Sequence, residues 1–448
     1  MNRHSIAGYF LSAVATIALF TSCSKHDVGH NGNHQPVSYS SEVIDKWMTL
    51  QLRLMRNATG IANHAFSRHF AYAGVAALES MAPGLPAHTK WSGRWNGLTG
   101  LPVFNRSVHY YYPANANAAL AAINKAMFPN ANSADKIAID SLEAALNQSF
   151  LNTQPQALIT ASSDFGRQVA AAVFNWSETD GYKVANSPYN PPVGPGLWKP
   201  TAPAFASPAT PYWGNNRTII SGSIENTQPS APPAYSVEPG TSFHNMVKYV
   251  YDASQNLTDD QKAMAIFWRD VPGVSSPGHW LSILQQVIRH KSCSLDKAAL
   301  AYALTGTAVN DALISCFKTK YQFNLVRPIT YIREVMGQAA WSPYLGTPAH
   351  PEYPSAHSSL SAAAALVIEN LFGNSGMFID HTYDYLGFTP RSYSTFSAIA
   401  TEAGQSRFFA GIHYQVSINA GLEQGRKVTA NIFWPFFKGG KPEEAITR

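Results

Sequence analysis

The sequence predicts a mainly α-helical protein in which the helices form one bundle with long loop insertions. Three observations predict this class. Apolar residues recur at helical spacing in most long segments, few segments alternate as strands do, and no repeat of fixed period is visible. The chain has 448 residues, of which 45% are hydrophobic and only 13% charged, so it is able to bury a large core.

The first 40 residues are typical of an export signal followed by a tether. A short apolar run follows Arg3 and His4 and leads to "TSC", which ends at Cys23. The run is short for a membrane span, and small residues before a cysteine are typical of a bacterial lipoprotein processing site. We expect residues 1–23 to be a signal peptide and the polar residues 24–40 a flexible tether. The alternative is an uncleaved anchor helix. The protein is expected to be exported, as a periplasmic, outer-membrane or cell-surface lipoprotein that meets the membrane only through this anchor.

Residues 41–448 are predicted to form a single α-helical domain. Between residues 184 and 241 the chain is rich in Pro, Gly and Asn and contains isolated tryptophans, which predicts a long ordered loop or a lid over a cleft. Helical spacing is found on both sides of this loop. The helical stretches are residues 41–82, 115–128, 134–150, 162–182, 259–270, 278–290, 296–317, 359–373, 393–409 and 416–433.

Charge and cysteine content exclude several classes of protein. The net charge is only +5 and no Lys/Arg run is present, so nucleic acid is not expected as a partner. The sequence contains no CxxC, GxxxxGK[ST] or GxGxxG, so zinc ribbons, P-loops and dinucleotide sites lack support. After lipoprotein processing at Cys23, Cys293 and Cys316 remain. The sequence leaves open whether they pair or stay free and buried.

Two motifs in the C-terminal third contain candidate ligands for an anion. Lys320 and Arg327 are seven residues apart, nearly two helical turns, so both cations are expected on one helix face, and Pro328 is expected to end that helix directly after Arg327. The second motif, "PSAH", places Ser355 and His357 at the start of a helix. Unpaired backbone N–H groups and the helix dipole attract anions at such an end.

The third motif, "SRFFAGIHYQVS", adds a second arginine and a second histidine. A helix break at Gly411 is expected to let Arg407 and His413 reach the same point. Each motif alone has an ordinary explanation, as a solvated cationic face or a hydrogen-bonded histidine. Together they supply guanidinium, ammonium, hydroxyl and backbone N–H donors for an anion with several oxygens. The two imidazoles add groups that titrate near neutrality, one to bond to the central atom and one to move protons.

These motifs resemble the three-part signature of vanadium-dependent haloperoxidases and PAP2-type acid phosphatases. The order and spacing K-x6-RP, P-S-x-H and S-R-x5-H match that signature between residues 320 and 413, and the sequence is most similar to the bacterial haloperoxidase-like branch. Weaker similarity extends to residues 310–323, to "PGHW" at 277–280 and to residues 67–80. The resemblance implies a helical bundle of the vanadium haloperoxidase/PAP2 type.

The resemblance also implies roles for individual residues. His413 is the axial group that bonds vanadium or, in a phosphatase, attacks phosphorus. His357 is the acid/base, and Lys320 polarises the bound peroxide. Asp270 is loosely matched to a carboxylate that supports the second arginine. The equatorial oxygens of the oxyanion are bound by a larger set, namely Lys320, Arg327, Arg407, the Ser355 hydroxyl and the Ala356 N–H. The cofactor is vanadate (V5+) in a haloperoxidase, and a phosphatase needs none.

Three positions bear on the choice between these activities. Ala356 stands where the superfamily usually has Gly, so its methyl group is expected to crowd the oxyanion. Ser417 stands where an Asp often orients the axial histidine, and a neutral partner is expected to leave His413 less basic, unless another carboxylate substitutes. His350 matches a position that is aromatic in chloroperoxidase-like members and histidine in bromoperoxidase-like ones. An incidental loop histidine is the alternative there.

The sequence therefore predicts a vanadate-dependent haloperoxidase, an oxidoreductase that uses hydrogen peroxide to oxidise halide, iodide or bromide rather than chloride, to a hypohalous acid equivalent. The first alternative is a periplasmic acid phosphatase that acts on phosphate monoesters through a His nucleophile. The second is a non-catalytic surface lipoprotein that binds glycan or protein through its many aromatic residues. The length of the chain and its N-terminal helical region favour the haloperoxidase. A homo-oligomer is compatible with the sequence, which does not identify the organic substrate.

Overall fold

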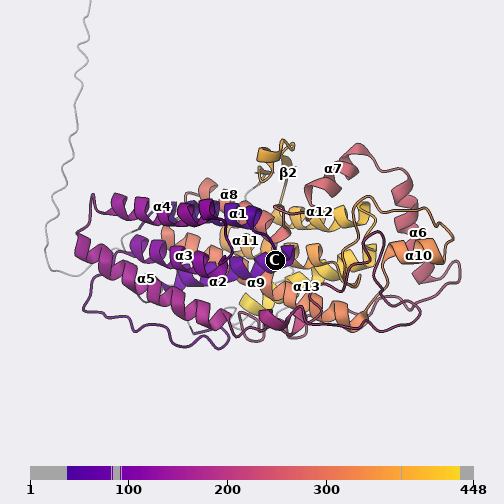
Figure 1. Cartoon of the computed structure of the whole chain (residues 1–448). Coiled ribbons are helices and arrows are strands. Elements are labelled where there is room, and N and C mark those ends of the chain that lie inside the picture. The colour runs from indigo at the N-terminus through magenta and orange to yellow at the C-terminus, as the bar shows by residue number, and fades with distance from the viewer. Residues whose placement is uncertain (1–37, 82, 84–90, 92, 375, 434–448) are drawn as a thin grey trace, which may run out of the picture. The chain divides into compact units, whose positions relative to one another are not determined.

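The structure is a computed structural model that describes residues 38–81, 83, 91, 93–374 and 376–433 (Figure 1). The expected signal peptide and residues 24–37 of the expected tether lie outside the described residues. The folded unit begins at Ser38. The end of the expected tether belongs to this unit, because the N–H of Leu295 donates to the carbonyl of Tyr39 at 2.8 Å and Ser40 forms an antiparallel bridge with Ser294.

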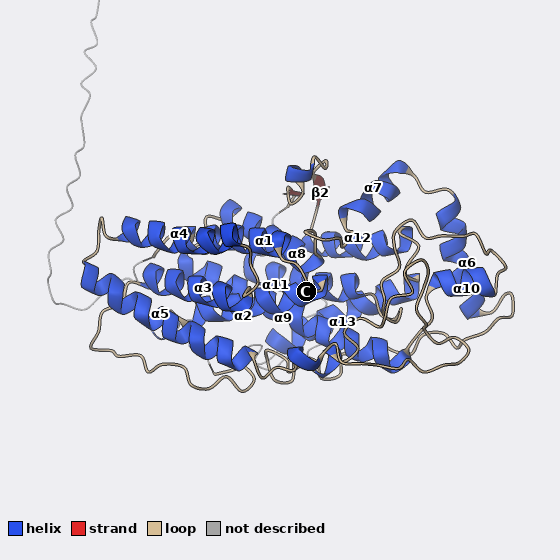
Figure 2. Ribbon diagram, viewed as in Figure 1, coloured by secondary structure: helices blue, strands red, loops and turns tan. Residues whose placement is uncertain are grey.

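The mainly α-helical class is confirmed in the described part of the chain (Figure 2). The α-helices are α1 Glu42–Asn57, α2 Phe66–Glu79, α3 Tyr112–Met127, α4 Ser133–Phe150, α5 Gln156–Ser177, α6 Ser242–Gln255, α7 Asp259–Phe267, α8 Ser276–His290, α9 Leu295–Phe323, α10 Pro328–Glu334, α11 Ala356–Phe372, α12 Phe396–Phe409 and α13 Gln415–Phe433. Two short antiparallel strands, β1 Phe378–Asp380 and β2 Arg391–Tyr393, form a hairpin. The 3-10 turns are Asn63–Ala65, Tyr182–Val184, Trp213–Asn215 and Asp384–Leu386.

Helix α9 lies at the centre of the bundle. It packs on α2 and α11. Helices α3, α4 and α5 lie toward the left end of the bundle in Figure 1, and α12 and α13 lie toward the right. Helix α9 is long and apolar enough to cross a membrane, but 94% of that window is buried inside the protein, as expected for a core helix. The backbones of α2 and α9 approach closely, because a Cβ added at Gly306 would lie 2.8 Å from the Cα of Ala71. Glycine is therefore required at this crossing.

A second close approach places the start of α11. A Cβ added at Gly421 of α13 would lie 2.5 Å from the carbonyl oxygen of Ser355, the residue that precedes α11. The N–H of Ser355 donates to the carbonyl of Ser417 at 3.0 Å, which fixes the same junction. Helices α11 and α13 are thus held in register at the "PSAH" motif.

The loop between residues 184 and 241 is ordered, as predicted, and contains no helix longer than three residues. Trp198 and Trp213 are almost completely buried in it. Asp311 of α9 fastens the loop, because its carboxylate accepts the N–H of Ile219 at 2.8 Å and the hydroxyl of Ser223 at 2.7 Å. The sequence left open whether Cys293 and Cys316 form a disulfide. In the structure both thiols are free and buried.

Candidate active site

Lys320 lies in the last turn of α9 and is completely buried. Its Nζ donates to the carbonyls of Pro351 at 3.0 Å and Glu352 at 2.9 Å. The expectation that Pro328 ends this helix is wrong. Helix α9 already ends at Phe323, since Asn324 adopts the left-handed conformation (φ 46°), and Pro328 begins α10 instead. Lys320 and Arg327 therefore do not share a helix face, and it is the turn between them that brings both to one place.

Arg327 precedes α10 and is also completely buried. Its Nη1 donates to the carbonyl of Ile412 at 2.8 Å, and its Nε donates to the carbonyl of His350 at 2.9 Å. Its Nη2 lies 3.0 Å from Nδ1 of His350. One guanidinium thus connects the loop before α11 to the loop between α12 and α13, and it places His350 at the edge of the site.

The "PSAH" segment begins α11 as predicted. Ser355 is the N-cap, and its hydroxyl accepts the N–H of Ser358 at 3.4 Å. His357 is 8% exposed, and its Nε2 lies 2.9 Å from the carbonyl oxygen of Trp268. That carbonyl is an acceptor, so Nε2 carries the proton. The Nδ1 atom makes no hydrogen bond to a described residue and is left for proton exchange.

Arg407 lies in the last turn of α12 and is 4% exposed. Its Nη1 donates to the same carbonyl of Trp268 at 3.2 Å. The helix break predicted at Gly411 is present, since α12 ends at Phe409, Gly411 has φ +77° and α13 begins at Gln415. The break turns His413 back toward Arg327, whose Nη1 lies 3.3 Å from Nε2 of His413.

The partner of His413 is Glu352, a residue that the sequence analysis did not single out. Nδ1 of His413 lies 2.7 Å from Oε1 of Glu352, and Oε2 of Glu352 accepts the hydroxyl of Ser417 at 2.5 Å. The alternative that the sequence left open, another carboxylate in place of a residue at position 417, is therefore present, and Ser417 helps to hold that carboxylate. With the proton on Nδ1, the lone pair of Nε2 accepts from Nη1 of Arg327 and is the side of the ring that could bond to an electrophilic centre in its place.

Burial and repulsion between like charges shift the pKa values of the titratable side chains in the site strongly. Burial lowers the pKa of Lys320 to about 7 and lowers the pKa of Arg327 and of Arg407 to about 10 each. Burial and the cationic head of Arg327 hold the pKa of His413 well below its usual value. Burial raises the pKa of Glu352, although the charge of Arg327 opposes this shift. A cluster of perturbed groups is typical of a functional site.

The three buried cations make no direct ion pair, although Glu352 lies near Lys320 and Arg327 and Asp270 lies near Arg407. None of Lys320, Arg327 and Arg407 forms an ion pair with a described residue. Three buried cations beside two carboxylates leave an excess of positive charge, which is costly to bury, so this donor set fits an oxyanion such as vanadate or phosphate. In the described part of the chain, no group of three His, Cys, Asp or Glu side chains is arranged to hold a metal cation. The residues of the site are therefore suited to hold an anion, with Nε2 of His413 facing Arg327.

Comparison with solved structures identifies the family. The chain is similar to the first bacterial vanadium-dependent iodoperoxidase, with a TM-score of 0.79, 31% sequence identity and coverage of 89% of this chain and 97% of that chain. The chain belongs to the vanadium-dependent haloperoxidase family. The family model for the second helical-bundle domain of VCPO matches residues 300–438, which include all three motifs. No curated protein matches this chain.

More distant members of the haloperoxidase family share the fold. The holo-type bacterial vanadium-dependent chloroperoxidase has a TM-score of 0.60 and 17% identity, with coverage of 88% of this chain and 94% of that chain. The apo-type bacterial vanadium-dependent chloroperoxidase has a TM-score of 0.59 and 17% identity, with coverage of 86% of this chain and 93% of that chain. At this identity the likeness concerns the fold alone.

The two additional residues suggested by the resemblance lie at the edge of the site. His350 is half-buried and contacts Arg327 as described, and its ring centroid lies 5.3 Å from that of Phe317. Asp270 does not form an ion pair with Arg407. Its Oδ1 accepts the N–H of Ser276 at 2.8 Å, and its Oδ2 lies 3.6 Å from Nε2 of His357.

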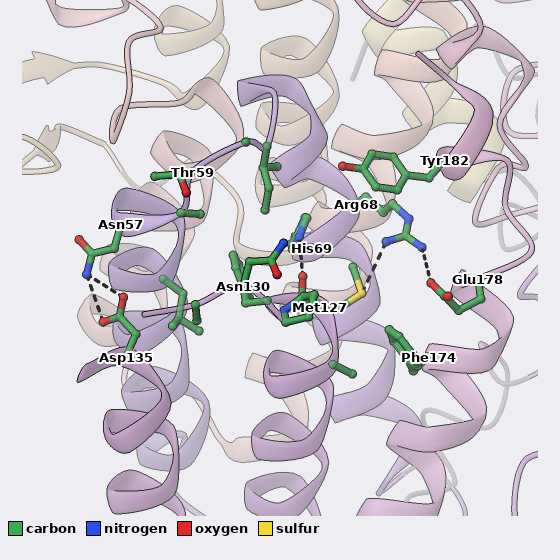
Figure 3. A pocket seen from close by; sticks show the side chains of 18 of the residues that line it. Asn57, Thr59, Arg68, His69, Met127, Asn130, Asp135, Phe174, Glu178 and Tyr182 are labelled. Carbon is green, nitrogen blue, oxygen red and sulfur yellow. Dashed lines mark hydrogen bonds and ion pairs between the residues drawn. The ribbon is translucent and has the colours of Figure 1, made fainter. Parts of the chain in front are cut away.

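The early similarity segment, residues 67–80, lies outside the site. Arg68 lines a separate cavity of about 390 Å³ between α1, α2, α3 and α5, and no residue of the three motifs lines it (Figure 3). The guanidinium of Arg68 pairs with Asp180 at 2.6 Å and donates to the carbonyl of Ser177 at 2.5 Å. Arg68 thus forms a direct ion pair, which none of the three cations of the site does with a described residue.

Two functional groups were missed from the sequence for different reasons. Glu352 is the only Asp, Glu, Lys or Arg residue between Glu334 and Glu369, which is a usable signal. The carbonyl of Trp268 carries no sequence signal, because every residue has such a group. Only the fold shows that it accepts from both His357 and Arg407.

Proposed function

We propose that this protein is a vanadate-dependent haloperoxidase, an oxidoreductase that uses hydrogen peroxide to oxidise halide to a hypohalous acid equivalent, with iodide or bromide favoured over chloride. The observation that carries this proposal is membership of the vanadium haloperoxidase family. The buried cationic heads of Lys320, Arg327 and Arg407 near the imidazole of His413 fit an oxyanion and support the proposal.

Vanadate is the cofactor that these residues would hold. Nε2 of His413 would bond the metal, and Glu352 keeps that nitrogen deprotonated because its carboxylate accepts the hydrogen bond that Nδ1–H of His413 donates. The oxygens of the anion would be bound by Lys320, Arg327, Arg407, the Ser355 hydroxyl and the N–H of Ala356. Bound vanadate supplies a Lewis-acidic centre that activates hydrogen peroxide toward halide without a change in oxidation state.

The proposed reaction consumes a proton, X⁻ + H2O2 + H⁺ → HOX + H2O, so the site needs a proton carrier. His357 fits this role, because Nε2 is bonded to the carbonyl of Trp268 and Nδ1 is free. Burial and the nearby Arg407 lower the pKa of His357 to about 4, while Asp270 opposes this shift. The imidazole therefore starts neutral and is able to accept a proton from peroxide and return it.

The preference for iodide or bromide rests on His350 and on the similarity to an iodoperoxidase. The imidazole of His350 accepts from Arg327 and adds a polar group at the edge of the site, where an aromatic side chain would leave an apolar wall. Burial, Lys320 and Arg327 hold the pKa of His350 well below its usual value, so it is neutral at physiological pH.

An acid phosphatase remains the competing activity, because the same donors suit a phosphoryl group. His413 has the carboxylate of Glu352 as its partner, so the basicity of this imidazole does not separate the two activities. Family membership, and not the geometry of the donors, favours the haloperoxidase.

For location, we propose export and lipid anchoring at Cys23 on the basis of residues 1–23. Radiolabelled palmitate incorporated by the wild type and lost in Cys23→Ala would support this proposal, and equal labelling of both would exclude it.

One pair of assays tests the function. Purified protein is given orthovanadate, hydrogen peroxide and iodide, bromide or chloride, and halogenation of a phenolic indicator is followed. In parallel, hydrolysis of p-nitrophenyl phosphate is measured without vanadate. Halogenation that depends on added vanadate supports the haloperoxidase. Phosphate release that vanadate abolishes, without halogenation, supports the phosphatase. Inactivity of folded protein in both assays would support a binding protein.

A further inference from the structure

One backbone carbonyl orients two side chains of the candidate site. The carbonyl oxygen of Trp268 lies 2.9 Å from Nε2 of His357 and 3.2 Å from Nη1 of Arg407. These two residues come from different helices, α11 and α12, and Trp268 follows the last residue of α7. A shift of Trp268 would therefore move the proton carrier and one oxyanion ligand together.

Trp268 is held by its side chain. The indole is 1% exposed, and its Nε1 donates to Oε1 of Glu402 at 3.1 Å. One face of the indole stacks on the imidazole of His279, with ring centroids 4.1 Å apart and an interplanar angle of 20°. The position of the carbonyl thus depends on the plane of the His279 ring.

The His279 ring is fixed in turn by a buried carboxylate. Nε2 of His279 lies 2.6 Å from Oδ2 of Asp380, and the two side chains are 1% and 0% exposed. Asp380 ends β1 and also accepts the N–H of Thr382 at 2.9 Å. Nδ1 of His279 has no hydrogen-bond partner among the described residues. The ring is therefore oriented by a single strong bond to Asp380 together with its stacking contacts.

We propose that His279 and Asp380 are positioning residues of the active site, which act through the carbonyl of Trp268 on His357 and Arg407. Asp380 sets the plane of the His279 ring, the ring sets the indole, and the indole sets the carbonyl. Neither His279 nor Asp380 hydrogen-bonds to a residue that is proposed to bind vanadate. The proposal rests on the proposed function in one respect, the assignment of His357 as the proton carrier.

The stacking contact of the His279 ring and the hydrogen bond between His279 and Asp380 are separable by mutation. In H279A/D380N the dyad is removed and nothing stacks on Trp268. In H279F/D380N the dyad is equally absent, but an aromatic ring of similar size faces the indole. The two variants differ only in that ring, so a difference in activity between them reports on the stacking contact. His69→Ala is the matched control, because His69 is also a buried histidine (2% exposed) but hydrogen-bonds only to backbone carbonyls of Ala65 and Met127.

At saturating vanadate we expect the kcat for iodide oxidation to fall about tenfold to hundredfold in H279A/D380N, with KM for iodide and peroxide changed less than threefold. H279F/D380N should recover most of the loss. His69→Ala should lower the melting temperature but keep kcat. Should H279A/D380N not fold, Asp380→Asn alone, which keeps the ring, should lower kcat severalfold. Equal kcat in the two double variants, or wild-type kcat in Asp380→Asn, would overturn the proposal.

Affinity for orthovanadate is measured on the same variants and needs no turnover. Because Arg407 binds the same carbonyl, H279A/D380N should bind vanadate severalfold more weakly than H279F/D380N. A wild type that binds vanadate but oxidises no halide would refute the proposed function, while this affinity difference would still decide the role of His279. Equal affinities would overturn that role.

Discussion

Nδ1 of His413 lies 2.7 Å from Oε1 of Glu352, and the two side chains are only 3% and 0% exposed. Glu352 also accepts the backbone N–H of Tyr414 at 2.9 Å, so the carboxylate fixes both the ring and the chain at this point. A buried carboxylate in this position orients a ligating histidine and increases its basicity. The geometry therefore assigns to Glu352 the role that the sequence suggested for position 417.

Replacing Glu352 by Gln should weaken vanadate binding about 10- to 100-fold, because the amide is a poorer acceptor for the Nδ1 proton of His413. Equilibrium titration of the folded variant with orthovanadate measures this effect. Ser417→Ala is the control, since it removes one hydrogen bond from the carboxylate but keeps its charge. It should weaken binding less. Unchanged affinity in Glu352→Gln would refute this role.

Vanadate affinity should depend on pH through Lys320. Burial lowers the pKa of Lys320 to about 7, so in the free site the amine is largely neutral above that pH. The ammonium form binds the anion, and the bound anion raises this pKa again, so binding takes up a proton and affinity falls as the pH rises above about 7. Titrations between pH 6 and pH 9 test this dependence.

The comparison for that experiment is Lys320→Arg, which stays charged over the whole range. Titration of vanadate itself affects both proteins equally. The wild type should therefore lose more affinity with rising pH than the arginine variant does. Parallel curves for the two proteins would show that Lys320 is already protonated in the free site.

His350→Phe should change halide preference without removing the cofactor. The imidazole accepts from Nη2 of Arg327, but Arg327 keeps its bonds to the carbonyls of His350 and Ile412 in the variant. We expect vanadate affinity within about threefold of wild type, since only one neutral hydrogen bond is lost. The ratio of chloride to iodide turnover should rise. An unchanged ratio would indicate that His350 does not contact the halide.

Gly306→Ala tests the packing that carries Lys320. The added methyl group would clash with the backbone of α2 at Ala71, and only a movement of one of the two helices would relieve this clash. We expect a loss of unfolding free energy of about 1–3 kcal/mol, measured by urea denaturation. Gly346→Ala is the matched change, because nothing lies within 4 Å of its added Cβ. If both variants are equally stable, the two helices are less tightly packed than described.

The sequence was sufficient to predict the helices and the residues that meet in the site, because helical periodicity and motif spacing are local signals. It was insufficient to predict the course of the backbone between those residues. Lys320 and Arg327 were expected on one helix, but an asparagine in the left-handed conformation ends α9 at a position that spacing alone does not reveal. The break at Gly411 was predictable, because glycine is the residue that accepts its positive φ.

Contacts between segments distant in the chain were the least predictable. Glu352 reaches His413 across 61 positions, and the carbonyl of Trp268 reaches His357 across 89. Asp270 was expected to support Arg407, and it does so through its charge and not through an ion pair, because its carboxylate is bonded to Ser276 at the start of α8. Such pairings depend on tertiary packing and leave no periodic trace in the sequence.

The central claim is that three buried cations and one histidine nitrogen hold a single vanadate. The most direct test is an equilibrium titration of the wild type and of His413→Ala with orthovanadate, with bound vanadium counted per chain. We predict one bound vanadate per wild-type chain and at least about tenfold weaker binding in the variant, because the bond from Nε2 is lost. A wild type that binds no vanadate, or a variant that binds it equally well, would contradict the account.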